Sequence, residues 1–257
     1  MWNNNIPVIK KLSIADYHCI MVSCYKQDMD RGYIIILHKL LERKEYELQT
    51  AFLLAQQGFK CILVDLYGHG EDGNKIPLKL DELVYLSVEK ISEIINKISN
   101  KGSTISLIGV SLGALVCLCL ASYNSKVSNI VSLLGSGRIK ELSKRNSFNK
   151  FQKGFGEQYF QKTGLLCSEF FTKYDPYDNP EFLQSSRLLM INGNMDFTIP
   201  ISLVRDTVSS LKTYSNNNSK QLNFKYLELP YRGHQCTPDI YEQSVRWLID
   251  NTNFINS

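Results

Sequence analysis

The chain has 257 residues, of which 44% are hydrophobic and 21% charged, and its formal net charge is +4. This length is ordinary for a single α/β domain with a substantial buried core. The charge is mild and no basic cluster is interleaved with aromatic residues, which argues against nucleic-acid binding. No apolar run in the sequence reaches the length of a membrane span.

The seven cysteines form neither a disulfide pattern nor a metal-binding pattern. Their number is odd, no Cys-x-x-Cys pair occurs, and most lie within apolar runs. We therefore expect buried, reduced thiols. The N-terminus, MWNNNIPVIKKL, lacks the apolar segment of a signal peptide, so a cytoplasmic location is the expectation. No cluster with metal-ligand spacing is present, and no metal or cofactor is expected.

The first half of the chain predicts strands that alternate with helices. Two segments around the polar turn 13–16 predict a β-hairpin at the edge of a sheet. Short apolar runs at 33–37 and 60–65 fit strands that are buried on both faces, as in parallel sheets. Helical spacing at 45–57, with Gly58 as its stop, and an amphipathic pattern at 81–99 predict the helices between these strands.

The second half continues this alternation. It predicts strands at 127–135, 187–192 and 223–229, helices at 199–214 and 238–250, and a polar loop at 215–220. Residues 138–186 break the rhythm and are interpreted as a helical lid inserted between late strands, with a solvated insertion as the alternative. The whole chain, 1–257, is thus expected to be one α/β domain with a mostly parallel sheet flanked by helices.

The stretch TISLIGVSLGALVCLCLA, residues 104–121, stands out for its chemistry. A buried strand leads into Gly109-Val110-Ser111-Leu112-Gly113 and then into an apolar helix. A serine between two glycines at a strand-to-helix junction is the pattern of a nucleophile elbow. The sharp turn strains the serine backbone and leaves room only for small neighbours, so glycines flank it.

Two further residues could complete a catalytic triad with Ser111. Asp196 follows the strand at 187–192, and His234 follows the strand at 223–229. The carboxyl ends of strands are where an open α/β sheet gathers its site. In this arrangement His234 takes the proton of the Ser111 hydroxyl, and Asp196 orients the imidazole.

These motifs, together with ILHKL (36–40), LLAQQGFKCILVDLYGHGED (53–72) and GHQCTPD (233–239), resemble the α/β-hydrolase fold superfamily. The resemblance extends from about Gly32 to the last helix and is closest to small bacterial esterases of the YitV and dienelactone-hydrolase-like groups. It implies an oxyanion hole made by the backbone N–H groups of Leu112 and Leu40. Lys39 departs from the family, which usually has glycine after His38, and is considered as a contact for an acidic substrate group.

The leading functional hypothesis is a serine hydrolase that cleaves a small-molecule carboxylic ester or thioester through an acyl-enzyme. The alternatives are acyl transfer or peptide cleavage by the same triad, and a non-catalytic binding module. His38 and His69 are interpreted as loop braces, and Asp65 as an acid in the wrong order for the triad. The aromatic residues of 138–186 could line an acyl pocket or seat the lid. The natural substrate and the oligomeric state stay open.

Overall fold

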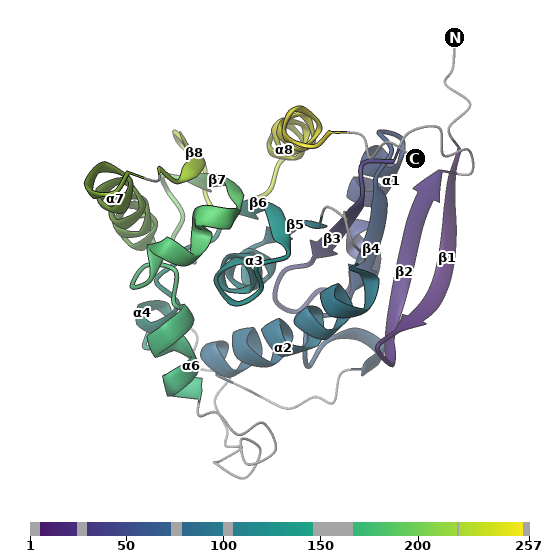
Figure 1. Cartoon of the computed structure of the whole chain (residues 1–257), viewed down its shortest axis with the longest axis horizontal. Helices are drawn as coiled ribbons and strands as arrows, with labels where there is room; N and C mark the ends of the chain where they lie inside the picture. Colours follow the sequence, from purple (N-terminus) through teal and green to yellow (C-terminus); the bar gives the residue numbers. More distant parts are fainter. Residues whose placement is uncertain are drawn as a thin grey trace.

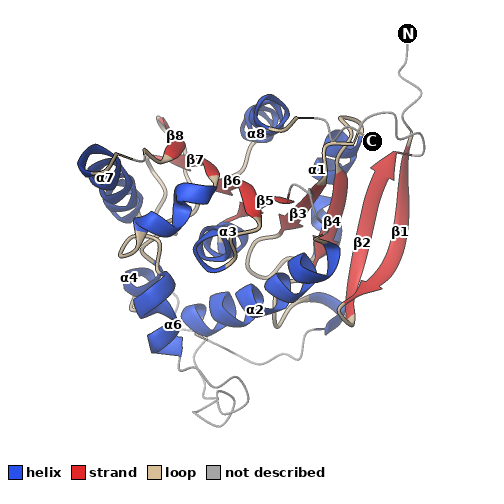
Figure 2. Cartoon of the chain, viewed as in Figure 1, coloured by secondary structure: helices blue, strands red, loops and turns tan. Residues whose placement is uncertain are grey.

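The structure is a computed structural model that describes residues 6–24, 30–72, 79–99, 105–145, 167–219 and 221–253. Strands and helices alternate along most of the chain (Figures 1 and 2). The strands are β1 (Pro7–Ile14), β2 (Tyr17–Cys24), β3 (Tyr33–Leu37), β4 (Lys60–Val64), β5 (Ile105–Val110), β6 (Val127–Leu133), β7 (Arg187–Gly193) and β8 (Asn223–Leu229). The α-helices are α1 (Leu48–Ala55), α2 (Leu80–Ile98), α3 (Leu112–Tyr123), α4 (Ile139–Ser143), α6 (Cys167–Tyr174), α7 (Ile201–Asn217) and α8 (Pro238–Asn251). Short 3-10 segments are η1 (Lys44–Glu47), η2 (Gly70–Asp72) and η4 (Pro180–Ser185).

The eight strands form one sheet in the order β1-β2-β4-β3-β5-β6-β7-β8. From β4 to β8 neighbouring strands are parallel, while β1 and β2 join antiparallel, as the sequence predicts. The strand order reverses between β3 and β5, because β4 follows β3 on one side and β5 lies on the other. Such a reversal opens a crevice at the carboxyl ends of the two strands, where ligands bind in open α/β sheets.

Helices cover both faces of this sheet (Figure 1). Apolar side chains of α2, α3 and α7 pack on one face, and those of α1 and α8 pack on the other. The central strands lie between these layers, and every residue of β5 is buried. This explains why β5, ISLIGV, is apolar on both faces apart from Ser106 and does not alternate between apolar and polar residues. The single sheet is therefore sandwiched between two layers of helices, and the ends of its strands are available for a site.

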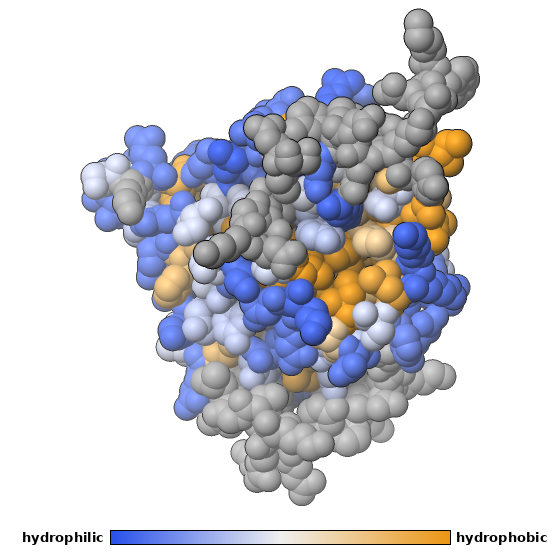
Figure 3. Space-filling model, turned by 45° about the vertical axis from the view of Figure 1, so that its right-hand side comes forward, coloured by the Kyte–Doolittle hydropathy of each residue, from blue (hydrophilic) through white to orange (hydrophobic). Residues whose placement is uncertain are grey.

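The β1–β2 hairpin forms one edge of the sheet, as expected. Its turn uses Ala15 and Asp16 in left-handed conformations, with φ of 49° and 65°. Strand β1 exposes Lys10 and Lys11, and such charges discourage edge-to-edge association of sheets. Figure 3, turned to bring this side forward, shows hydrophobic surface (orange) bordered by hydrophilic surface (blue).

Two helix boundaries differ from the sequence expectation. The predicted helix 45–57 begins as the 3-10 segment η1 and continues as α1, which ends at Ala55; Gly58, with φ of 94°, lies in the turn that follows. Helix α7 continues to Asn217, so the prediction that residues 215–217 are a loop is wrong. These residues extend a helix whose buried face ends at Leu211, and polar residues on an exposed face do not interrupt helical hydrogen bonding.

The segment 138–186 is described only in part, because residues 146–166 lie outside the described ranges. Its described portions include α4, α6 and η4. Phe170 and Phe171 of α6 are 1% exposed, and the Phe170 ring lies 4.8 Å from that of Tyr85 in α2 and 5.6 Å from that of Tyr123 in α3. These two phenylalanines therefore seat the segment on the body. The lid role of 138–186 stays a prediction.

Six of the seven cysteines lie in described side chains, and all six are free thiols. Four of them, Cys19, Cys61, Cys117 and Cys119, are buried. Within the described residues, no helix combines the length and apolar character needed to cross a membrane.

Candidate active site

Ser111 occupies a strained turn between β5 and α3, with φ of 54° and ψ of −113°. Its backbone N–H donates to the carbonyl of Leu133, 2.8 Å away, which anchors the turn to β6. A Cβ at Gly109 would lie 2.3 Å from the Gly113 carbonyl, and one at Gly113 would lie 2.4 Å from the oxygen of Leu37. Side chains cannot fit at either position, which is the physical basis of the Gly-x-Ser-x-Gly pattern.

Asp196 lies in the loop after β7 with its side chain fully buried. One carboxylate oxygen, Oδ1, accepts the backbone N–H groups of Thr198 and Ile199 at 2.8 and 2.9 Å. The other oxygen, Oδ2, lies 2.7 Å from Nδ1 of His234. Because the two amides hold the carboxylate in place, only Oδ2 is left to orient the histidine.

His234 connects this carboxylate to the serine. Its Nε2 lies 2.8 Å from Oγ of Ser111, while its Nδ1 faces Asp196. A carboxylate accepts only, so the proton sits on Nδ1 and the Nε2 lone pair accepts the serine hydroxyl. The structure therefore brings together the three residues predicted for the triad, in a geometry that allows proton transfer from Ser111.

The acid loop and the histidine loop are joined through their backbones. The N–H of Met195 donates to the carbonyl of Arg232 at 2.8 Å, and the N–H of Tyr231 donates to Oδ1 of Asn194 at 2.8 Å. A Cβ at Gly193 would lie 2.3 Å from the Arg232 oxygen. The two loops thus form one unit, so the acid and the base keep their relative positions.

A pocket of about 280 Å³ opens over Ser111 and His234. Besides Ser111 and His234, its wall has five aliphatic residues and three polar or charged ones. The aliphatic side chains belong to Leu40, Leu80, Leu112, Leu115 and Ile199, and the polar or charged ones to Lys39, Glu42 and Thr198. A wall of this kind favours an apolar group next to the serine, with polar contacts at a few points.

Both residues expected to supply oxyanion N–H groups line this pocket. Leu112 is the first residue of α3, and the N–H of a first helical residue has no partner within the helix. Leu40 comes from the loop after β3. This oxyanion loop, residues 38–43, meets α3 where Gly113 leaves room for the Leu37 carbonyl.

Lys39 does not strain the oxyanion loop. The left-handed residue there is Leu41, with φ of 64°. The Lys39 ammonium lies 3.0 Å from a carboxylate oxygen of Glu42, and the two side chains are about a third exposed. The side chain in the usual glycine position is therefore accommodated by a local ion pair on the pocket wall. Contact of Lys39 with an acidic substrate group stays a prediction.

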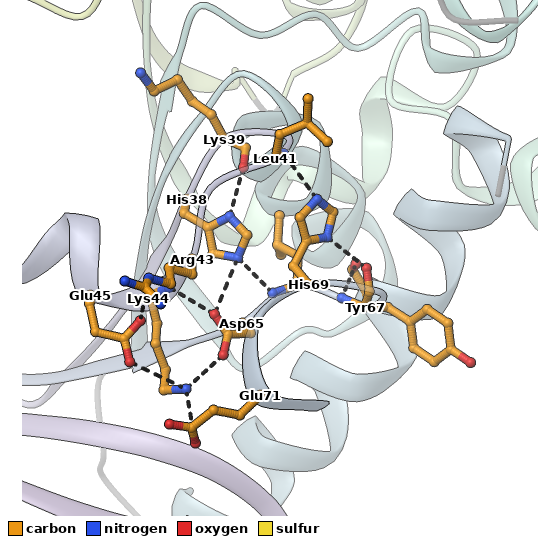
Figure 4. Close-up of polar contacts among 12 residues, drawn as sticks. His38, Lys39, Leu41, Arg43, Lys44, Glu45, Asp65, Tyr67, His69 and Glu71 are labelled. Carbon is orange, nitrogen blue, oxygen red and sulfur yellow. Dashed lines mark hydrogen bonds and ion pairs between the residues drawn. The ribbon is translucent and has the colours of Figure 1, made fainter. Parts of the chain in front are cut away.

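A buried polar cluster lies beneath the oxyanion loop (Figure 4). The Asp65 carboxylate accepts from the Lys44 backbone at 2.8 Å and from the Lys44 ammonium at 2.7 Å. Burial raises the pKa of Asp65, but the bonds from Lys44 outweigh it and the net shift is downward. Oδ1 of Asp65 also lies 3.8 Å from the His38 ring. Lys44 is a residue that sequence reasoning missed, because no motif marks it.

No group of three or more His, Cys, Asp or Glu residues in the described part of the chain could hold a metal ion. The groups that the structure brings together at the pocket are the Ser111 hydroxyl, the His234 imidazole and the Asp196 carboxylate. A hydroxyl hydrogen-bonded to an imidazole that a carboxylate orients is the arrangement that activates a protein nucleophile.

Comparisons with known proteins agree with this fold. Residues 33–252 match the family described as alpha/beta hydrolase fold. "Putative esterase YitV" of Bacillus subtilis (strain 168) is 24% identical over 200 residues, which cover 74% of this chain and 78% of the relative.

Two solved structures show the same architecture. TT1662 from Thermus thermophilus has a TM-score of 0.74 at 17% identity, with 95% of this chain and 97% of that chain covered. The "Putative Dienelactone Hydrolase" from Klebsiella pneumoniae subsp. pneumoniae MGH 78578 has a TM-score of 0.63 at 13% identity, with 96% and 98% covered. The resemblance stated from the sequence is confirmed. The chain belongs to the alpha/beta hydrolase fold family.

Proposed function

We propose that this chain is a serine hydrolase that cleaves a carboxylic ester or thioester of a small molecule through an acyl-enzyme on Ser111. The observation that carries the proposal is the unbroken hydrogen-bond chain from Asp196 through the His234 ring to the Ser111 hydroxyl. The similarity to YitV supports an ester as the substrate.

In the acylation step, Nε2 of His234 takes the hydroxyl proton while Oγ of Ser111 attacks the carbonyl carbon. The carbonyl oxygen becomes an oxyanion, which the N–H groups of Leu112 and Leu40 stabilise. The tetrahedral intermediate then expels the alkoxide or thiolate, which receives the proton from His234. A water molecule, deprotonated by His234, then attacks the acyl-enzyme. The second tetrahedral intermediate expels Oγ of Ser111, which takes the proton back from His234, and the acid is released.

The pocket wall points to a short apolar acyl group. Leu80, Leu112 and Leu115 contribute aliphatic surface within a volume of about 280 Å³, and Ile199 contributes from the acid loop. We expect turnover to be highest for short acyl chains and to fall as the chain outgrows this volume.

The test is a panel of p-nitrophenyl esters and acyl thioesters of increasing chain length, assayed with wild type and Ser111→Ala. We expect wild-type turnover, labelling of Ser111 by a fluorophosphonate, and a loss of about 10³-fold or more in the variant. Wild type that neither turns over any substrate nor takes the label would contradict the proposal, as would a fully active Ser111→Ala.

A further inference from the structure

The carbonyl group of Lys39, which belongs to the Lys39–Leu40 peptide, contacts the buried ring of His38 (Figure 4). Nδ1 of His38 lies 2.7 Å from the Lys39 carbonyl oxygen, and Nε2 accepts the backbone N–H of Leu66 at 3.0 Å. A carbonyl can only accept and an amide N–H can only donate. The two contacts therefore place the ring proton on Nδ1, and the His38 ring donates to Lys39 and accepts from Leu66.

The Lys39 carbonyl also accepts the backbone N–H of Glu42 at 3.2 Å, and the two bonds together fix the side to which this peptide turns. The Lys39–Leu40 peptide is planar and trans, so its C=O and N–H are directed to opposite sides. With the Lys39 oxygen turned toward the buried ring, the Leu40 N–H is directed away from that ring, and Leu40 lines the pocket together with Ser111 and Leu112. We propose that His38 is a positioning residue that orients the Leu40 N–H as an oxyanion donor. This inference rests on the proposed function.

The surroundings of His38 keep this orientation constant. The ring is fully buried, and burial lowers its pKa to about 4 although the Lys39 carbonyl favours the protonated form. It is therefore neutral near pH 7 and keeps one tautomer. Asp65 binds Lys44 at the far end of the oxyanion loop, and the next residue, Leu66, binds His38 at the near end. Both ends of the loop are thus tied to the carboxyl end of β4.

His69 provides an internal comparison. Its Nε2 accepts the N–H of Leu41 at 3.1 Å, and its Nδ1 faces the carbonyl of Tyr67 at 2.9 Å. It braces the same loop, one peptide further on, and does not bond to the Lys39–Leu40 peptide. Removing His69 therefore loosens the loop without releasing the donor, which separates general bracing from donor orientation.

The experiment compares His38→Gln with His38→Asn, because their amides fall near different ring nitrogens. Glutamine retains an acceptor near the Nε2 position and loses the donor to Lys39, whereas asparagine retains a donor near the Nδ1 position. We expect His38→Gln to lower kcat on the best p-nitrophenyl ester by about 10-fold or more, up to the 10²-fold to 10³-fold of a fully lost oxyanion donor, with KM within about threefold. Its fluorophosphonate labelling slows in parallel. His38→Asn and His69→Ala stay within about threefold of wild-type kcat.

A His38→Gln enzyme with wild-type kcat would overturn the inference, as would equal losses in His38→Gln and His69→Ala. Nitrogen-15 NMR of the wild-type ring gives a test that needs no variant: a proton on Nε2 would also overturn it. If wild type shows no Ser111-dependent turnover, the proposed function fails and this inference fails with it. Ser111-dependent turnover with an indifferent His38 overturns this inference alone.

Discussion

Two histidines in this chain lie beside a buried aspartate, and they differ in what surrounds each pair. His234 bonds directly to Asp196 at 2.7 Å and turns its other nitrogen to the Ser111 hydroxyl. His38 lies 3.8 Å from Asp65, whose carboxylate is occupied by Lys44. Proximity of the two residue types is thus a poor guide to chemistry.

The two pairs differ in the contacts of their other polar atoms, the second carboxylate oxygen and the second ring nitrogen. Asp196 has its second oxygen held by backbone amides, so its charge is available to an imidazolium. The charge of Asp65 is balanced by an ammonium, and Nε2 of His38 already accepts from Leu66. The first pair can gain and return a proton during a reaction, and the second can only hold backbone in place.

The largest difference is expected in turnover. Asp196→Asn should lower kcat by about 10⁴-fold, because an amide favours the wrong imidazole tautomer. Asp65→Asn should leave kcat within about tenfold in the fraction of protein that remains folded. The measurement is kcat on the best p-nitrophenyl ester, normalised to sites titrated by fluorophosphonate. Equal losses in the two variants would erase the distinction between the pairs.

The unfolding free energies of the two variants should show the opposite order, with the larger loss in Asp65→Asn. Asp65→Asn removes the nearest counter-charge of the buried Lys44 ammonium, which keeps Glu71 at 3.5 Å and Glu45 at 3.7 Å. The variant should lower the unfolding free energy by up to about 3–5 kcal/mol, measured by urea titration. The folded pKa of Asp65 is lowered, so its contribution is present above the ordinary carboxyl pKa and is lost as pH falls through the folded value. The deficit of the variant should therefore shrink on acidification below about pH 4.

A double variant serves as the control for this stability prediction. Asp65→Asn with Lys44→Met also removes the buried ammonium that has lost its nearest partner, and should recover part of the loss. No recovery would mean that the charge of Lys44 is unimportant.

Two glycine-to-alanine variants test the regions around the two histidines by steric effects, which are expected to be smaller. Gly113 lies beside the oxyanion loop that contains His38, and Gly233 precedes His234. Gly113→Ala places a Cβ 2.4 Å from the Leu37 oxygen, so the oxyanion loop must shift and both stability and kcat should fall. Gly233→Ala, next to His234, meets only the Met195 oxygen at 3.7 Å and should change the melting temperature little. Thermal unfolding and the ester assay on both variants check this contrast. A harmless Gly113→Ala would refute the steric account.

The smallest effect concerns Glu47, a buried carboxyl near Glu42. Burial, followed by the charge of Glu42, raises the pKa of Glu47 to about 7. A raised folded pKa means that wild type loses stability as pH rises from about 4.5 to 7. Glu47→Gln should therefore melt higher than wild type at pH 8 and nearly equally at pH 5. The exposed Glu242→Gln is the matched control and should show no such pH dependence.

The strands and the nucleophile elbow were predictable because their signals are local. A run such as YIIIL is too short for a helix and too apolar for an exposed strand, and β3 occupies that run. Gly109 and Gly113 are required by contacts within a few residues of Ser111 and from Leu37. Asp196 and His234 could be predicted because both follow strands of a sheet whose ends converge.

The buried ion pair was not predictable in the same way. Lys44 lies in a polar stretch, LERKEYE, that reads as exposed loop and helix start. It is buried because Asp65, the residue after β4, lies beneath it, and because Gly70 leaves space where a Cβ would lie 2.0 Å from the carboxylate. This environment forms only when the segments that contain Lys44, Asp65 and Gly70 come together in the folded chain. The hydrophobic periodicity of the sequence does not indicate such long-range contacts. The orientation of the Leu40 N–H depends on the same long-range contacts.

The joining of the acid and histidine loops also has a consequence for biosynthesis. Ser111 and its elbow are made from contacts within the first two thirds of the chain, whereas His234 follows 123 residues later. A nascent chain that has formed β5 and α3 holds a serine without its base. Reactivity toward a fluorophosphonate should therefore appear only after β7, β8 and their linked loops have assembled. Labelling of ribosome-released chains would then time the last event of folding.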